Sequence, residues 1–391
     1  MPRLPSLLLN LAHALDHLFL LIFATAVGAI AADFGFARWE DLMPYTAGAF
    51  LMFGIGSIPA GRLGDLWGRR RMMLVFFHGM GLSALAVALT TNAWQMAVAL
   101  TVLGAFSAIY HPVGIPMLVQ RSATPGRAIG VNGLAGNLGI AAAALTTGFL
   151  VQHFGWRAAF AVPGVLSIAL GLVFARVAPA ETAAPARKPA SKAQALPRDL
   201  VVRVFVVMVA SATTGSLLFN LTTNGNAQLL AERMTGIVAD PARLGLLLAA
   251  VYTVASVAQL VVGRAVDRVP LKPLYLAILG AQVLLFAAAA QASGWLWYAL
   301  AIGCMVCVFG AIPFQDLMVV RYVDDSMRSR VAGTRIAISF TISSAAVLLL
   351  GPAVKAAGFD ALLVVLAGVA LASLLIVVWL PGQRRLQAAA R

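Results

Sequence analysis

The chain has few charged residues and few cysteines for its length. Only 11% of its 391 residues are Asp, Glu, Lys or Arg, whereas 61% are hydrophobic and the mean hydropathy is +0.92. Soluble proteins are far less apolar, so this balance predicts a multi-pass membrane protein. The two cysteines, Cys304 and Cys307, lie in one apolar run and indicate neither a disulfide framework nor a zinc motif.

Sequence motifs for ATP hydrolysis and for nucleophilic catalysis are also missing. The sequence has no G-x-x-x-x-G-K-[ST] loop, so we expect no ATP hydrolysis. No Ser or Cys nucleophile is placed convincingly beside the titratable residues, so we expect no enzyme. We also expect no cofactor and no metal. The net charge of +14 comes from basic residues dispersed among loops, which argues against nucleic-acid binding.

Apolar runs of the length that crosses a bilayer recur along the chain. Each is near 20 residues or longer and lacks the strict alternation of barrel strands, so each predicts a helix. The expected spans are 7–31, 42–61, 72–91, 94–119, 128–151, 157–178, 200–223, 243–262, 273–292, 295–319, 331–354 and 360–380.

The loop charges predict the orientation of these twelve helices. With both termini cytoplasmic, most of the 28 Lys and Arg residues lie on the cytoplasmic side. Those left on the outer side are Arg38, Arg157, Arg233, Arg243 and Lys355. We expect a monomer in the inner (plasma) membrane. The first run is too long for a signal-peptide core and contains Asp16, so we expect it to be retained as a helix.

A hydrophilic linker divides the chain into two similar halves. Residues 179–199 are rich in Ala, Pro and basic residues, and separate a six-helix half at 1–178 from a six-helix half at 200–391. Short patterns recur about 202 positions apart, which indicates an internal duplication. The recurring residues are Gly61, Arg62 and Asp65 with Gly263, Arg264 and Asp267, and Gly155 with Gly358.

The segment "GRLGDLWGRRRMML", Gly61 to Leu74, resembles the loop between helices two and three of the major facilitator superfamily. The resemblance implies an all-α membrane fold of two pseudo-symmetric six-helix bundles, with a cavity lined by helices one, four, five, seven, ten and eleven. Within this superfamily, two short segments resemble the fosmidomycin-resistance type of exporter. They are "YHP", which begins at Tyr110, and "NGLAGNLG", which begins at Asn132.

The loop motif has a predicted conformational role. Gly61 and Gly68 permit close helix approach and a tight turn, and Asp65 can pair with Arg69 or with the amino end of a neighbouring helix. Such contacts, with Asp267 in the second copy, would hold one state of an alternating-access cycle. In the alternative interpretation, the arginines from Arg69 onward only enforce the positive-inside topology.

Asp16 is a charge inside the first apolar run. At 100° per residue, Asn10, His13, Asp16 and His17 fall on one side of a helix. An ionised carboxylate in a membrane must be paired, hydrated or protonated, whereas histidine titrates near neutral pH. This face predicts proton coupling or substrate binding; the alternative is a fixed polar clasp to another helix.

Other polar residues in apolar runs are further candidates for the cavity. Tyr110 and His111 precede Pro112, which should kink the fourth helix. Each of the remaining candidates has a structural alternative, such as a hydrogen bond within its own helix or, for arginine, a contact with lipid phosphate. They are Asn132, Asn137, Asn220, Asn224 and Arg335.

These patterns predict a secondary transporter that moves a small organic solute by alternating access, with proton-coupled export favoured. An anionic solute would fit if Arg335 and the histidines face the cavity. The alternatives are proton-linked uptake of a small metabolite and a membrane receptor on the same fold.

Overall fold

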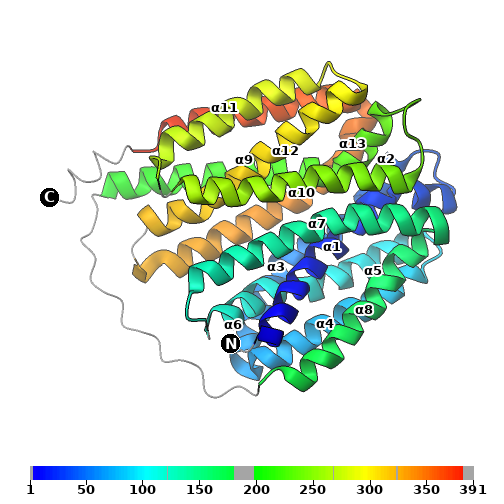
Figure 1. Cartoon of the computed structure of the whole chain (residues 1–391), viewed down its shortest axis with the longest axis horizontal. Coiled ribbons are helices and arrows are strands. Elements are labelled where there is room, and N and C mark those ends of the chain that lie inside the picture. Colours follow the sequence, from blue (N-terminus) through cyan, green and yellow to red (C-terminus); the bar gives the residue numbers. More distant parts are fainter. Residues whose placement is uncertain (1–2, 121, 180–197, 267, 323–324, 382–391) are drawn as a thin grey trace. The chain divides into compact units, whose positions relative to one another are not determined.

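The structure is a computed structural model that describes residues 3–120, 122–179, 198–266, 268–322 and 325–381. Every regular element within these ranges is helical, as Figure 1 shows. The elements are α1 (Arg3–Asp33), α2 (Trp39–Leu42), η1 (Met43–Thr46), α3 (Ala47–Trp67), α4 (Arg69–Ala88), α5 (Ala93–Ser107), η2 (Tyr110–Gly114), α6 (Ile115–Gln120), α7 (Pro125–Phe154), α8 (Trp156–Val177), α9 (Arg198–Arg233), α10 (Pro241–Ala265), α11 (Leu271–Ala289), α12 (Gly294–Tyr322) and α13 (Asp325–Val378).

The described residues contain 11 helices that are long and apolar enough to cross a membrane. The last of them lies within α13, where Gly358 has φ 78° and ψ 173° and breaks the helical path. The break falls between the two spans predicted at 331–354 and 360–380. The predicted all-α membrane fold is confirmed, and the twelve predicted spans match these 11 once α13 is divided at its break.

Residue contacts divide the chain into two compact units that differ from the sequence halves. The first unit contains Met1–Ala184, Leu221–Thr253 and Ser343–Ala356. The second contains Pro185–Asn220, Val254–Ile342 and Ala357–Arg391. Parts of α9, α10 and α13 therefore pack with the first half of the sequence, and the first unit holds the residues around Asp16 that are described below.

Small residues let α1 and α7 lie close together in the first unit, where the two helices are in contact. A Cβ at Gly139 of α7 would lie 2.1 Å from the carbonyl oxygen of Ala14 in α1. Only glycine permits this approach, as in other membrane helix pairs. Gly139, which lies in the predicted fifth helix, therefore packs against the helix that contains Asp16.

The internal repeat is visible in backbone and side-chain geometry. Gly155 has φ 80°, and Gly358, 203 positions later, has φ 78°. Arg70 donates to the carbonyl oxygen of Ala178 (Nε to O 2.9 Å), just after the end of α8. Lys272, 202 positions after Arg70, donates to the carbonyl oxygen of Leu380 at 2.8 Å, just after the end of α13. A basic side chain thus satisfies free carbonyls at the carboxyl end of a helix at the same place in each half.

Candidate functional site

Asp16 lies near the middle of the membrane-crossing part of α1, Leu4–Asp33, and its side chain is completely buried. One carboxylate oxygen, Oδ1, accepts a hydrogen bond from the Ser107 hydroxyl. The other, Oδ2, lies 3.6 Å from Nε2 of His111. Two residues from the end of α5 and from η2 therefore contact the carboxylate that the sequence singles out.

The fourth span changes its helical form where Pro112 occurs. The α-helix ends at Ser107, and Tyr110–Gly114 continues as a π-helical turn, η2. Proline lacks an N–H and its ring clashes with the preceding turn, so a regular α-helix is disfavoured there. π-Helical turns within helices are frequent at functional sites. This one places Tyr110 and His111 beside α1.

Three histidines meet beside Asp16. Nδ1 of His13 is 2.7 Å from the carbonyl oxygen of Asn132, so this nitrogen carries the ring proton and donates it. Nε2 of His17 is 3.1 Å from Nε2 of His13. The His111 ring lies edge-on to that of His13, with 5.1 Å between centroids. His13 is buried, whereas His17 and His111 are half-buried, so the cluster has an exposed side.

A hydrogen-bonded frame holds the cluster. Tyr110 donates to the Leu9 carbonyl oxygen at 2.8 Å, and its ring stacks on His13 with 4.8 Å between centroids. Nδ2 of Asn132 donates to the Tyr110 hydroxyl at 2.7 Å and to Oδ1 of Asn10 at 2.9 Å. These bonds join α1, η2 and α7 into one polar network inside an apolar unit.

The structure brings together six of the ten predicted coupling or substrate residues: His13, Asp16, His17, Tyr110, His111 and Asn132. Asn137 and Asn224 are buried elsewhere in the first unit. Asn220 belongs to the second unit and donates to the Ser216 carbonyl oxygen of its own helix at 2.9 Å. Arg335 lies in α13, but its side chain is outside the part of the chain that the structure describes.

Two neighbours of the cluster were not predicted from the sequence. The Phe53 ring from α3 lies 5.7 Å from the His111 ring. A Cβ at Gly136 of α7 would lie 2.6 Å from Cε1 of His13, so the absent side chain leaves room for the imidazole. Gly136 belongs to a glycine series that is visible in the sequence, whereas nothing distinguishes Phe53 from other apolar residues.

Gly61 and Gly68, the two glycines of the loop motif with a predicted conformational role, lie at a close contact and at a turn. Gly68 separates α3 from α4 with φ 94° and ψ 141°, a conformation that other residues rarely adopt. A Cβ at Gly61 in α3 would lie 3.3 Å from the Pro112 side chain, so α3 passes close to the π-helical turn.

The charged residues with a predicted conformational role, Arg69, Asp65 and Asp267, differ in what the structure shows of them. Arg69 donates to Oε1 of Gln120 at 3.1 Å, which ties the start of α4 to the end of α6. Asp65 is exposed, and within the described ranges no hydrogen bond or ion pair is recorded for its carboxylate. Asp267 lies outside the described residues.

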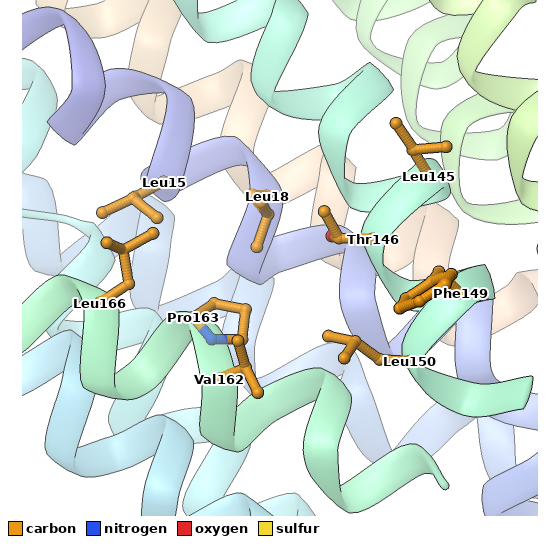
Figure 2. Close-up of a pocket in the computed structure, with 9 residues that line it drawn as sticks. All are labelled: Leu15, Leu18, Leu145, Thr146, Phe149, Leu150, Val162, Pro163 and Leu166. Atoms are coloured by element: carbon orange, nitrogen blue, oxygen red, sulfur yellow. The ribbon is translucent and has the colours of Figure 1, made fainter. Parts of the chain in front are cut away.

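A separate apolar cavity of about 380 Å³ lies between α1, α7 and α8 (Figure 2). Leu15, Leu18, Phe149 and Pro163 are among its lining residues. The hydroxyl of Thr146, its one polar lining residue, donates to the Ala142 carbonyl oxygen of its own helix at 2.7 Å. The cavity therefore offers contacts for hydrocarbon but no free polar group for a charged solute.

Comparison with known proteins places the chain in a family. The sequence model of the Major Facilitator Superfamily matches residues 9–231, more than half of the chain. A "Tetracenomycin C resistance and export protein" of Streptomyces glaucescens is 33% identical over 169 residues, or 41% of this chain and 31% of that protein. A "Gallate transporter" of Pseudomonas putida is 24% identical over 36% of this chain and 32% of that protein. The matched segments thus span about a third of these relatives.

Solved structures agree on the fold over nearly the full length. A crystal structure of a D-xylose-proton symporter superposes with a TM-score of 0.76 and covers 96% of this chain and 97% of that protein, at 13% identity. At this identity the similarity concerns the fold alone.

Proposed function

Because the chain belongs to the Major Facilitator Superfamily, we propose that this transporter exports a small organic solute in exchange for protons. The bundles at 1–178 and 200–391 would open alternately to the two sides of an inner membrane, with both termini in the cytoplasm. Asp65 and Arg69 would stabilise one of the two states.

The buried carboxylate of Asp16 is the observation that carries this proposal. It lies in a membrane-crossing helix with a hydroxyl donor, Ser107, and a histidine, His111, as its neighbours. Burying a charge without a permanent counter-charge is costly, so the carboxyl group is well suited to bind and release a proton as its exposure changes. His17 and His111, half-buried on the exposed side, would pass that proton to water.

Export is supported by the relative whose name includes resistance and export, Tetracenomycin C resistance and export protein. That similarity covers 41% of this chain, so the solute is proposed only by class. An organic anion is the favoured class if Arg335 faces the path together with the histidines.

Proteoliposomes with an imposed pH gradient test the proposal. When the lumen is acidic, an antiporter concentrates its solute inside as protons leave. One pH unit supplies about 1.4 kcal/mol per proton, which allows up to about tenfold accumulation. We expect Asp16→Asn to abolish accumulation while leaving solute exchange at equal pH measurable.

A matched carboxylate on the same helix controls for altered charge. Asp33 is at the exposed end of α1, where it accepts a hydrogen bond from Arg157 at 2.9 Å. Asp33→Asn should retain accumulation. Unchanged pH-driven accumulation by Asp16→Asn would refute the coupling role of Asp16.

Proton-linked uptake is the second candidate, supported by the similarity to a transporter named for a carboxylate, gallate. The same vesicles separate the two, because a symporter concentrates solute when the outside is acidic. Candidate solutes can first be screened by thermal stabilisation, since a ligand that binds the folded state raises its Tm. A receptor would show binding in this screen but no flux in vesicles.

A further inference from the structure

We propose that His13, His17 and His111 form a binding site for a divalent transition-metal ion, with Asp16 as the fourth ligand. This inference goes beyond the proposed transport function, because it concerns a ligand that binds whether or not a solute moves. The sequence alone predicts no metal here, since the three histidines come from two spans and match no metal-binding spacing.

The ligand atoms lie at distances that suit a small metal ion. One ring nitrogen from each histidine lies within 4.8 Å of the others. Zinc bonds to nitrogen and oxygen are about 2.1 Å long, so neighbouring ligands of a tetrahedral site are about 3.4 Å apart. Nε2 of His13 and Nε2 of His17 are 3.1 Å apart, and Nε2 of His111 is 3.6 Å from Oδ2 of Asp16. The largest separation exceeds the tetrahedral edge, so binding requires one imidazole to swing inward.

The outer hydrogen bond of His13 matches those around metal-binding histidines. Such a histidine usually donates its other ring N–H to a carbonyl or carboxylate, which fixes the tautomer. Nδ1 of His13 donates to the Asn132 carbonyl oxygen at 2.7 Å, so Nε2 keeps its lone pair for a ligand. Asp16 accepts from Ser107 through Oδ1, which leaves Oδ2 directed toward His111.

Charge balance also favours a cation at this place. Asp16 is completely buried, and among the described residues its recorded ion-pair partner is His111 rather than a lysine or arginine. A divalent ion beside the carboxylate would offset the cost of burying its charge. Three imidazoles and one carboxylate suit zinc or cobalt better than magnesium or calcium, which prefer oxygen ligands.

Cobalt binding provides the test, because tetrahedral Co²⁺ absorbs visible light far more strongly than octahedral aqueous Co²⁺. The full chain, purified in detergent without a polyhistidine tag and stripped with a chelator, is titrated with Co²⁺. We expect one ion per chain, a visible spectrum typical of a tetrahedral site, displacement by Zn²⁺ and a higher Tm. His13→Gln, His17→Gln and His111→Gln should each weaken binding by about tenfold or more.

The chain supplies matched controls. Its other two histidines, His78 in α4 and His153 in α7, lie outside the cluster, so His78→Gln and His153→Gln should bind Co²⁺ normally. Cys304→Ser and Cys307→Ser remove the thiols that could form a second site. Size-exclusion profiles identify any variant that fails to fold, and Asp16→Asn then tests the site through its Co²⁺ spectrum. Absence of the tetrahedral spectrum in the unmodified chain, or its equal loss in His78→Gln, would overturn the proposal.

Discussion

His13 shows how several elements fix a single side chain. Its ring stacks on Tyr110 from η2, its Nδ1 donates to the Asn132 carbonyl oxygen of α7, and Gly136 leaves the space that it occupies. Few rotamers satisfy all three contacts, so the direction of Nε2 toward His17 is set before any ligand or proton arrives.

The Tyr110 hydroxyl should contribute measurably to stability. It donates to Leu9 and accepts from Asn132, and its side chain is fully buried. Tyr110→Phe leaves buried polar groups with fewer partners, which costs about 1 to 3 kcal/mol. We expect a lower Tm in detergent.

Tyr45→Phe is the control for this change, since within the described ranges no hydrogen bond is recorded for that hydroxyl. An unchanged Tm in Tyr110→Phe would mean that water replaces the lost bonds and that this part of the cluster is more open than the structure indicates.

At the scale of elements, α1 could be predicted from the sequence and its partners could not. The helical period correctly places His13, Asp16 and His17 on one side, because that relation is local. Contacts such as Phe53 with His111 depend on which helices pack together, and single-sequence patterns contain no such information. Pro112 indicates an irregular helix, but the π-helical form of η2 depends on the packing around it.

The contact between α1 and α7 should tolerate no added methyl group at its closest point. A Cβ at Gly139 would lie 2.1 Å from the Ala14 carbonyl oxygen, so Gly139→Ala must separate the two helices. Overpacking of this kind costs about 1 to 3 kcal/mol. We expect a lower Tm together with weaker metal binding, because His13 lies one residue from Ala14.

Gly133→Ala is a matched control on the same helix, where an added Cβ meets no atom within 4 Å. Its Tm should be unchanged or slightly higher, because alanine favours the helix over glycine. Equal loss of stability in both variants would show that the close approach to α1 at Gly139 does not determine the effect.

At the scale of the molecule, the first unit joins parts of both sequence halves. Nζ of Lys355 in α13 is 2.5 Å from Oδ1 of Asp41 in α2, and Ser344 donates to the Ala47 carbonyl oxygen at 3.0 Å. The loop charges predict that this is the outer side. Within the first unit, these two contacts therefore join segments from both sequence halves.

Loss of the pair of Asp41 and Lys355 should make the separation of α2 from α13 only modestly easier. Both side chains are more than one-third exposed. Exposed pairs contribute about 0.2 to 1 kcal/mol, or at most about fivefold in an equilibrium. Thr46 is only 2% exposed, so thiol labelling of a Thr46→Cys variant reports how often this region becomes accessible. In a chain with Cys304→Ser and Cys307→Ser, Lys355→Gln should therefore speed that labelling by up to about fivefold.

Arg243→Gln serves as the control, since Arg243 pairs with Asp240 within its own turn and, within the described ranges, joins no separate segments. In the double variant Asp41→Asn, Lys355→Gln the effects should not add, because both changes break one contact. Fully additive effects would show that the two charges act independently.

The repeated contacts of Arg70 and Lys272 have a consequence for the order in which the protein is made. The acceptors of Arg70 lie at Ala175 and Ala178, so both sides of this contact are translated before the linker. The first six spans can therefore lock α4 to α8 while the rest of the chain is still on the ribosome. Lys272 finds its acceptors at Val378 and Leu380, more than 100 residues downstream. Each half is thus fastened by its own basic side chain, in the order of translation.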